Sequence, residues 1–180
     1  MAAVEPSMLN FIMPSNVTDI TDTIDQRRWK AALMNWLDDM RFHLAVTLVW
    51  NRRVGLDRAR ADLRNFVARV DEALVGSHFH KLHKDKRVEA VFAFEGMAHD
   101  HTHVHSLWKA PSSRWFDLGK LFPQQRDGLW SDVVPSGTYD VEACNWFGGN
   151  TEVVGYVLKQ QHRWSDPDLM VWASDFHRAR

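Results

Sequence analysis

Four histidines alternate along one short stretch of this 180-residue sequence, at positions 99, 101, 103 and 105. If the stretch is a strand, alternate side chains share one face, so His103 and His105 present two imidazoles side by side. Glu95 lies eight residues before His103, where a hairpin would bring its carboxylate alongside the pair. Two nitrogens and one carboxylate can hold a divalent cation and leave positions open for substrate oxygens. This ligand set suits Lewis-acid catalysis on a phosphate.

The alternation leaves two registers open, because His101, His103 and His105 all point to one face of a flat strand. We prefer His103 with His105, because Val104 lies between them and the segment 106–108, Ser-Leu-Trp, continues the strand. The alternative is the pair His101 and His103. If His101 is not a ligand, it either donates a hydrogen bond to a ligand residue or takes no part in the site. We expect His99 to contribute nothing. Isolated His-x-His patterns more often belong to polar surface strands.

Basic residues form two further groups that could contact phosphates. The chain continues from its first predicted strand into Arg52 and Arg53. A second His-x-His, at His78 and His80, lies in a Lys-rich connection without a neighbouring carboxylate, and we interpret it as a solvated segment. The basic residues of that connection, equally well explained as solvated surface, are Lys81, Lys84, Lys86 and Arg87.

Tyrosine is rare in this chain, which has two, Tyr139 and Tyr156. Tyr156 lies in a predicted helix with Lys159 three residues later, so the phenol and the ammonium share a helix face. A nearby cation favours the phenolate, which is a competent nucleophile towards a polarised phosphodiester. Taken alone, the same pattern describes a core tyrosine beside a solvated lysine. Cys144 has no evident histidine partner, and we expect it to be a packing residue.

These side chains need a sheet to position them, and the hydrophobic periodicity predicts one. Apolar and β-branched residues alternate in segments that we interpret as strands, at 42–50, 88–95, 101–108, 139–146 and, as a strand or a packing tail, 169–173. Helical periodicity begins at residue 27 and recurs at 56–75 and 151–161. It is weaker at 114–122. This order predicts an α+β fold with an antiparallel sheet of about five strands and helices packed on one side, ferredoxin-like or RRM-like.

The composition narrows the class of protein further. One cysteine excludes an internal disulfide and favours a reducing cytoplasm, and no apolar run is long enough to cross a membrane. Residues 1–25 carry a charge of −4 and we interpret them as an acidic arm, which leaves residues 26–180 as one domain with a charge of +3. That charge is too small for a nonspecific nucleic-acid coat.

Three motifs in order resemble those of the HUH endonuclease superfamily, specifically its single-tyrosine rolling-circle replication initiators. LAVTLVWN at 44–51 is similar to the first motif, Glu95 with HVH at 103–105 to the second, and YVLK at 156–159 to the third. The order matters, because relaxases of the same superfamily carry the tyrosine before the histidines. The resemblance covers roughly residues 42–162 of the predicted domain.

The resemblance implies an enzyme that nicks and joins single-stranded DNA at a specific sequence. By that likeness Glu95, His103 and His105 bind Mg²⁺ or Mn²⁺, Tyr156 forms a 5′-phosphotyrosine, and Lys159 steadies the phosphate or the phenolate. Two alternatives stay open: an HUH-type single-tyrosine transposase, and a noncatalytic module that binds single-stranded nucleic acid.

Overall fold

The computed structural model describes residues 24–97, 101–111, 114–123, 128–144, 151–158 and 169–177. The predicted arm at 1–25 falls outside them except for its last two residues. The α+β prediction is confirmed. The elements are α1 (Ile24–Asp39), β1 (Leu44–Val49), α2 (Leu56–Val75), the 3₁₀ turns η1 (Phe79–Lys81) and η2 (Lys84–Lys86), β2 (Glu89–Glu95), β3 (His103–Lys109), α3 (Trp115–Lys120), α4 (Leu129–Val133), β4 (Thr138–Ala143), α5 (Thr151–Val157), β5 (Met170–Trp172) and α6 (Ala173–Phe176).

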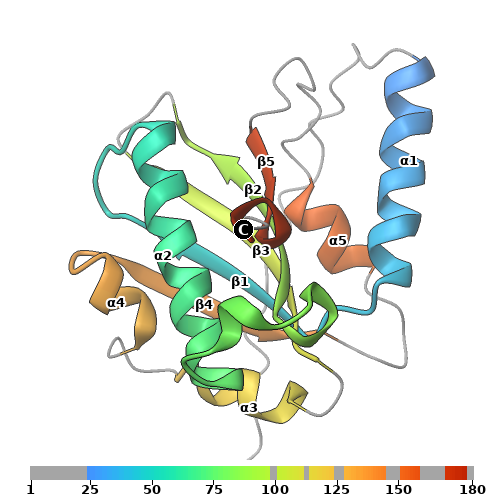
Figure 1. The fold of residues 1–180 in the computed structure, drawn as a ribbon. Helices are drawn as coiled ribbons and strands as arrows, with labels where there is room; N and C mark the ends of the chain where they lie inside the picture. Colours follow the sequence, from blue (N-terminus) through green and yellow to red (C-terminus); the bar gives the residue numbers. More distant parts are fainter. Residues whose placement is uncertain are drawn as a thin grey trace, which may run out of the picture.

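The five strands form one antiparallel sheet in the order β4-β1-β3-β2-β5 (Figure 1). As predicted, β2 and β3 are antiparallel neighbours, with Glu95 opposite His103. On the other side of β3, the register with β1 sets Thr47 opposite His105. The segment at 169–173 does supply an edge strand, β5, which pairs with β2. The central position of β3 places its histidines between two hydrogen-bonded neighbours.

Helices cover both faces of the sheet, and the prediction that they lie on one side is wrong. One buried cluster packs α2, α3 and α4 against one face, to which β2 contributes Phe92 and Phe94. A second cluster packs α1 and α5 against the opposite face, to which β2 contributes Val91 and Ala93. Figure 1 shows α2 and the α1–α5 pair on opposite sides of the strands. By the alternation of the strand, Glu95 belongs to the α1–α5 face.

The helix α2 matches its sequence pattern closely. Its buried stripe includes Leu63, Phe66 and Val70, and it ends at Gly76, whose φ of 89° is readily adopted by glycine. The α1 pattern predicts the helix but not all of its buried positions. Leu37 is fully buried, whereas Trp36 is 51% exposed and packs at a tilt against Trp172 of β5, with ring centroids 5.0 Å apart.

Two smaller features complete the fold. The five-residue helix α4 is absent from the sequence prediction, because one turn is too short to show a period. Cys144 is buried as expected, and burial, with the charge of Glu142, raises the pKa of its thiol to about 12. No helix among the described residues combines the length and the apolarity needed to cross a membrane.

Candidate active site

The ends of β2 and β3 bring the predicted ligand residues together. Glu95 Oε2 lies 3.3 Å from His103 Nε2 and 3.4 Å from His105 Nε2. One ligand atom from each residue falls within 4.8 Å of the others, and this is the group of the described residues that could hold a metal ion. The grouping matches the preferred register. His101 is exposed and stands outside the group, and His99 lies outside the described residues.

Each imidazole faces Glu95 with Nε2 and makes a second contact through Nδ1. His103 Nδ1 lies 2.9 Å from the backbone carbonyl oxygen of His101. Because a carbonyl can only accept, Nδ1 of His103 carries the hydrogen and donates it. His105 Nδ1 lies 2.8 Å from the hydroxyl oxygen of Thr47, on the neighbouring strand β1. Both rings therefore turn Nε2 towards the carboxylate, the arrangement that metal-binding histidines adopt when outer contacts orient them.

Burial makes this cluster a good match for a cation. Glu95 and His105 are each 4% exposed, and Glu95 Oε1 is buried without a hydrogen-bond partner in the described part of the chain. An unpaired buried carboxylate oxygen costs free energy that a bound cation would recover. Burial raises the pKa of Glu95, but the hydrogen bonds and charges of His103 and His105 outweigh it and lower that pKa to about 2. The carboxylate is therefore ionised at neutral pH and available as a ligand.

Gly96 directly follows the last residue of β2, Glu95, beside this cluster. Its φ is 70°, in the left-handed region, and a Cβ there would overlap the carbonyl oxygen of His101. A glycine is therefore needed for the chain to turn where the His101 carbonyl reaches His103. The sequence motif alone does not reveal this requirement.

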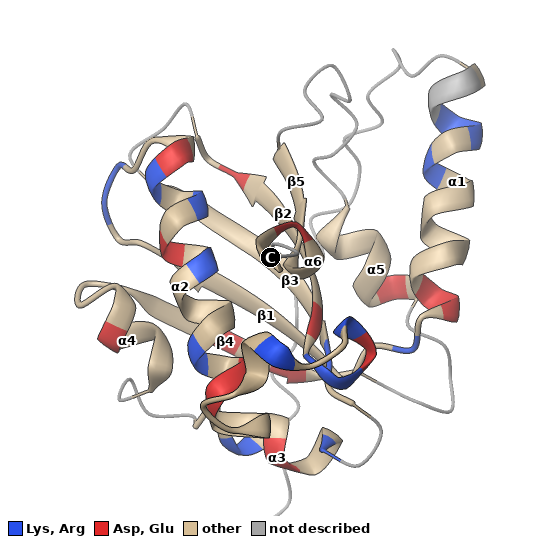
Figure 2. Cartoon of the chain, in the orientation of Figure 1, with Lys and Arg blue, Asp and Glu red and all other residues tan. Residues whose placement is uncertain are grey.

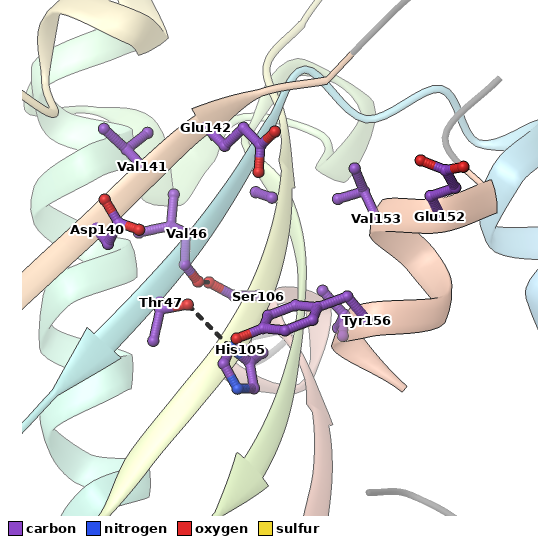
Figure 3. A pocket seen from close by; sticks show the side chains of 12 residues that line it. Val46, Thr47, His105, Ser106, Asp140, Val141, Glu142, Glu152, Val153 and Tyr156 are labelled. Carbon is purple, nitrogen blue, oxygen red and sulfur yellow. Dashed lines mark hydrogen bonds between the residues drawn. The ribbon is translucent and has the colours of Figure 1, made fainter. Parts of the chain in front are cut away.

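Tyr156 joins the cluster from the helix side. The buried residues Val154 and Val157 anchor α5 in the second cluster of the core, on the sheet face that carries Glu95. This position sets the Tyr156 ring edge-on to His105, with centroids 4.8 Å apart and an interplanar angle of 69°. Figure 3 shows the phenol reaching from α5 across His105, with its hydroxyl end towards Thr47. Lys159, its predicted partner, lies outside the described residues.

A pocket of about 440 Å³ opens beside Tyr156, between α5 and the strands β4, β1 and β3. Valine side chains form much of its wall, together with Thr47 and His105 (Figure 3). Three exposed acidic residues also line it: Asp140, Glu142 and Glu152. These carboxylates were not singled out by the sequence motifs, and they make this side of the site unfavourable for a phosphate.

The predicted phosphate contacts fall in two separate places. Arg52 and Arg53 are exposed on the connection from β1 to α2, which Figure 2 shows as a basic segment. This connection leaves β1 at Val49, directly opposite His103. The two arginines therefore lie at the end of the sheet that carries the triad of Glu95, His103 and His105. The lysines of the second group are exposed on η1 and η2, next to the opposite end of β2, ~20 Å along the strand from Glu95. They are Lys81, Lys84 and Lys86.

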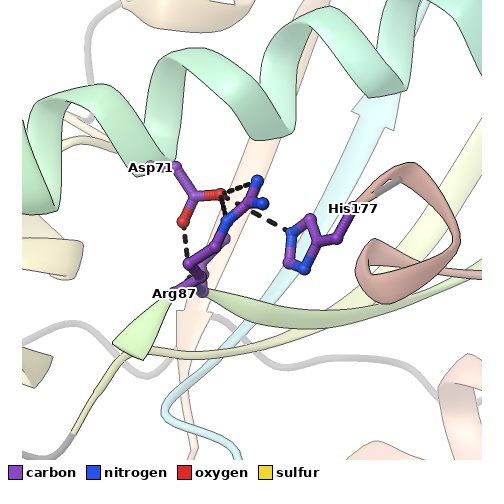
Figure 4. Close-up of polar contacts among 4 residues, drawn as sticks. Asp71, Arg87 and His177 are labelled. Atoms are coloured by element: carbon purple, nitrogen blue, oxygen red, sulfur yellow. Dashed lines mark hydrogen bonds and ion pairs between the residues drawn. The ribbon is translucent and has the colours of Figure 1, made fainter. Parts of the chain in front are cut away.

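Arg87 differs from these lysines, because its side chain is largely buried in an ion pair and is poorly placed for the predicted contact with DNA. Its side chain is 10% exposed and its Nε and Nη2 donate to Oδ2 of Asp71, at 2.9 and 2.7 Å. The other oxygen of Asp71 accepts the Val88 N–H at 2.8 Å, and His177 Nε2 lies 3.6 Å from Oδ2 (Figure 4). Arg87 therefore joins α2, β2 and the C-terminal end of α6 in a buried ion pair.

No protein-family model, curated protein or solved structure matches this chain. The resemblance to HUH endonucleases therefore stays a prediction from the three sequence motifs.

Proposed function

We propose that this protein is a metal-dependent endonuclease that cleaves and rejoins single-stranded DNA through a covalent tyrosine intermediate. The observation that carries the proposal is the contact of Tyr156 with His105. That contact, with ring centroids 4.8 Å apart, sets the phenol beside a three-residue ligand cluster. A buried tyrosine packed elsewhere on α5 would give no such juxtaposition.

In this proposal Glu95, His103 and His105 hold a divalent cation, Mg²⁺ or Mn²⁺. The bound cation would polarise a phosphodiester and stabilise the charge that develops on it. Imidazole nitrogens suit Mn²⁺ better than Mg²⁺, so Mn²⁺ is the more sensitive probe of the site. The low pKa of Glu95, about 2, keeps its carboxylate charged through the range in which such an enzyme would work.

Tyr156 supplies the nucleophile. Its phenol loses its proton to solvent and its oxygen forms a bond to phosphorus, while the bond from phosphorus to the 3′ oxygen breaks. The leaving oxygen takes up a proton and becomes a free 3′-hydroxyl, and the 5′ phosphate stays on the tyrosine. Attack by a 3′-hydroxyl on this phosphotyrosine reverses the exchange and joins strands.

The charge around the site favours one route for the DNA strand. Asp140, Glu142 and Glu152 repel phosphates from the β4 side of the pocket, whereas Arg52 and Arg53 attract them at the triad end of the sheet. We therefore assign the backbone contacts to the two arginines. Contact of the η1 and η2 lysines with the phosphates of a longer DNA strand stays a prediction.

The test is a covalent adduct. The protein is incubated with Mn²⁺ and an end-labelled pool of single-stranded DNA, and the products are separated on a denaturing gel. We expect an adduct that disappears with EDTA and with Tyr156→Phe. The matched control is Tyr139→Phe, which changes the chain's other tyrosine, whose hydroxyl donates to the Pro123 carbonyl away from the triad.

Three outcomes would overturn the proposal. An adduct that persists in Tyr156→Phe would mean a different nucleophile. An adduct that survives EDTA would remove the metal from the reaction. Binding of the pool by the wild-type protein without any adduct would instead indicate a noncatalytic single-stranded nucleic-acid-binding module.

A further inference from the structure

We infer that Thr47 is a positioning residue for the metal site, acting through His105. This inference rests on the proposed function, because it concerns the cation site that the function requires. Its basis is the 2.8 Å contact between the Thr47 hydroxyl and His105 Nδ1, together with the direct pairing of these residues across β1 and β3. It gives a physical role to the segment LAVTLVWN, which the proposed reaction otherwise leaves unused.

The two histidines differ in what their outer partners permit. The His101 carbonyl can only accept, so His103 keeps a hydrogen on Nδ1 and turns Nε2 towards Glu95, where a bound cation would replace the Nε2 hydrogen. A hydroxyl can both donate and accept. Thr47 can therefore donate to Nδ1 of His105 while Nε2 donates to Glu95, or accept from Nδ1 once Nε2 binds a cation. His103 is preset for a cation, and His105 can change its tautomer without moving.

The surroundings of Thr47 make this contact hard to replace. His105 is 4% exposed, so water has little access to its ring. Thr47 extends from a strand that is hydrogen-bonded on both sides, to β3 and to β4, so its backbone is held in place. The Tyr156 ring packs edge-on against His105 from the helix side. A rotation of the His105 imidazole would thus disturb both the ligand cluster and the position of the phenol.

The experiment compares Mn²⁺ affinity, without DNA, in the wild type and in Thr47→Val and Thr47→Ser. Valine keeps the shape and the strand preference of threonine but loses the hydroxyl, whereas serine keeps the hydroxyl. The matched control is Thr138→Val, which removes a hydroxyl on the neighbouring strand that accepts from Asn51 and contacts neither histidine. Free Mn²⁺ is followed by its electron paramagnetic resonance signal, and thermal unfolding shows that each variant folds.

We expect Thr47→Val to weaken Mn²⁺ binding by about 10- to 100-fold, the usual effect of losing an outer contact to a ligating histidine. Thr47→Ser should restore most of the affinity, and Thr138→Val should bind as the wild type does. At a Mg²⁺ concentration that saturates the wild type but not the variant, nitrogen-15 spectra should show His105 protonated on Nδ1 in the wild type and a mixture of tautomers in Thr47→Val.

The inference fails if Thr47→Val binds Mn²⁺ as tightly as the wild type. It also fails if the serine variant loses as much affinity as the valine variant, because packing and not the hydroxyl would then matter. A wild type that binds no Mn²⁺ would instead overturn the proposed metal site itself. The two failures are therefore distinguishable.

Discussion

Acid should destabilise this protein through one buried histidine, His43, which lies just before β1. It is 6% exposed, and its Nδ1 accepts the Ala110 N–H at 3.0 Å. Burial, and secondarily the charge of Lys109, lower the pKa of His43 from 6.5 to about 4. Between these two values the unfolded chain binds the proton and the folded chain does not. Stability is therefore lost as the pH falls through this window, by about 3 kcal/mol at pH 4.

The assay is urea unfolding of the wild type and of His43→Asn at several values between pH 7 and pH 4. Asparagine does not titrate, and its amide oxygen can accept the Ala110 N–H in place of Nδ1. Carboxylates contribute equally to both proteins, so the difference between the two curves isolates His43. We expect the wild type to lose about 3 kcal/mol more than the variant. Added salt should reduce the part due to Lys109 but not the part due to burial. Parallel curves would refute the reasoning.

Two further predictions concern charged residues away from the triad. Asp71→Asn leaves Arg87 buried without its counter-charge and should lower the free energy of unfolding by about 3–5 kcal/mol in urea. The control Asp132→Asn breaks an exposed pair with Arg69 and should cost at most about 1 kcal/mol, and equal losses would contradict the buried role. Changing Arg52 and Arg53 together to alanine should make the dependence of log affinity for single-stranded DNA on log salt shallower by about 1.4. An unchanged slope would mean that they are merely solvated.

Much of the fold follows from local patterns. Alternation identified the strands, and the hairpin-sized interval between 88–95 and 101–108 identified β2 and β3 as neighbours. The ligand cluster was predictable for the same reason, because strand alternation and one hairpin determine the positions of Glu95, His103 and His105. Each of these inferences requires residues that are close in the sequence.

What the sequence could not show depends on distant pairing. Thr47 is 58 residues from His105, and their contact requires the register between β1 and β3. Arg87 looked like one more cation in a basic connection, because the Asp71 carboxylate that neutralises it lies on α2. The face covered by α1 and α5 likewise depends on where α5 crosses the sheet, which no local period encodes. The exposed carboxylates of the pocket carry no sequence pattern at all.

The core divides into two clusters, and the larger one lies on the sheet face away from the groups proposed for the chemistry. The larger cluster lies between α2 and one sheet face, and the ligand residues, Tyr156 and the pocket lie on the other. Side chains on the rim of that pocket, such as Glu142 and Glu152, are exposed and make little contribution to stability. The rim of the pocket can therefore accept many side chains at little cost in folding. The same backbone is a scaffold on which substrate preference can diverge, or be engineered, independently of thermal stability.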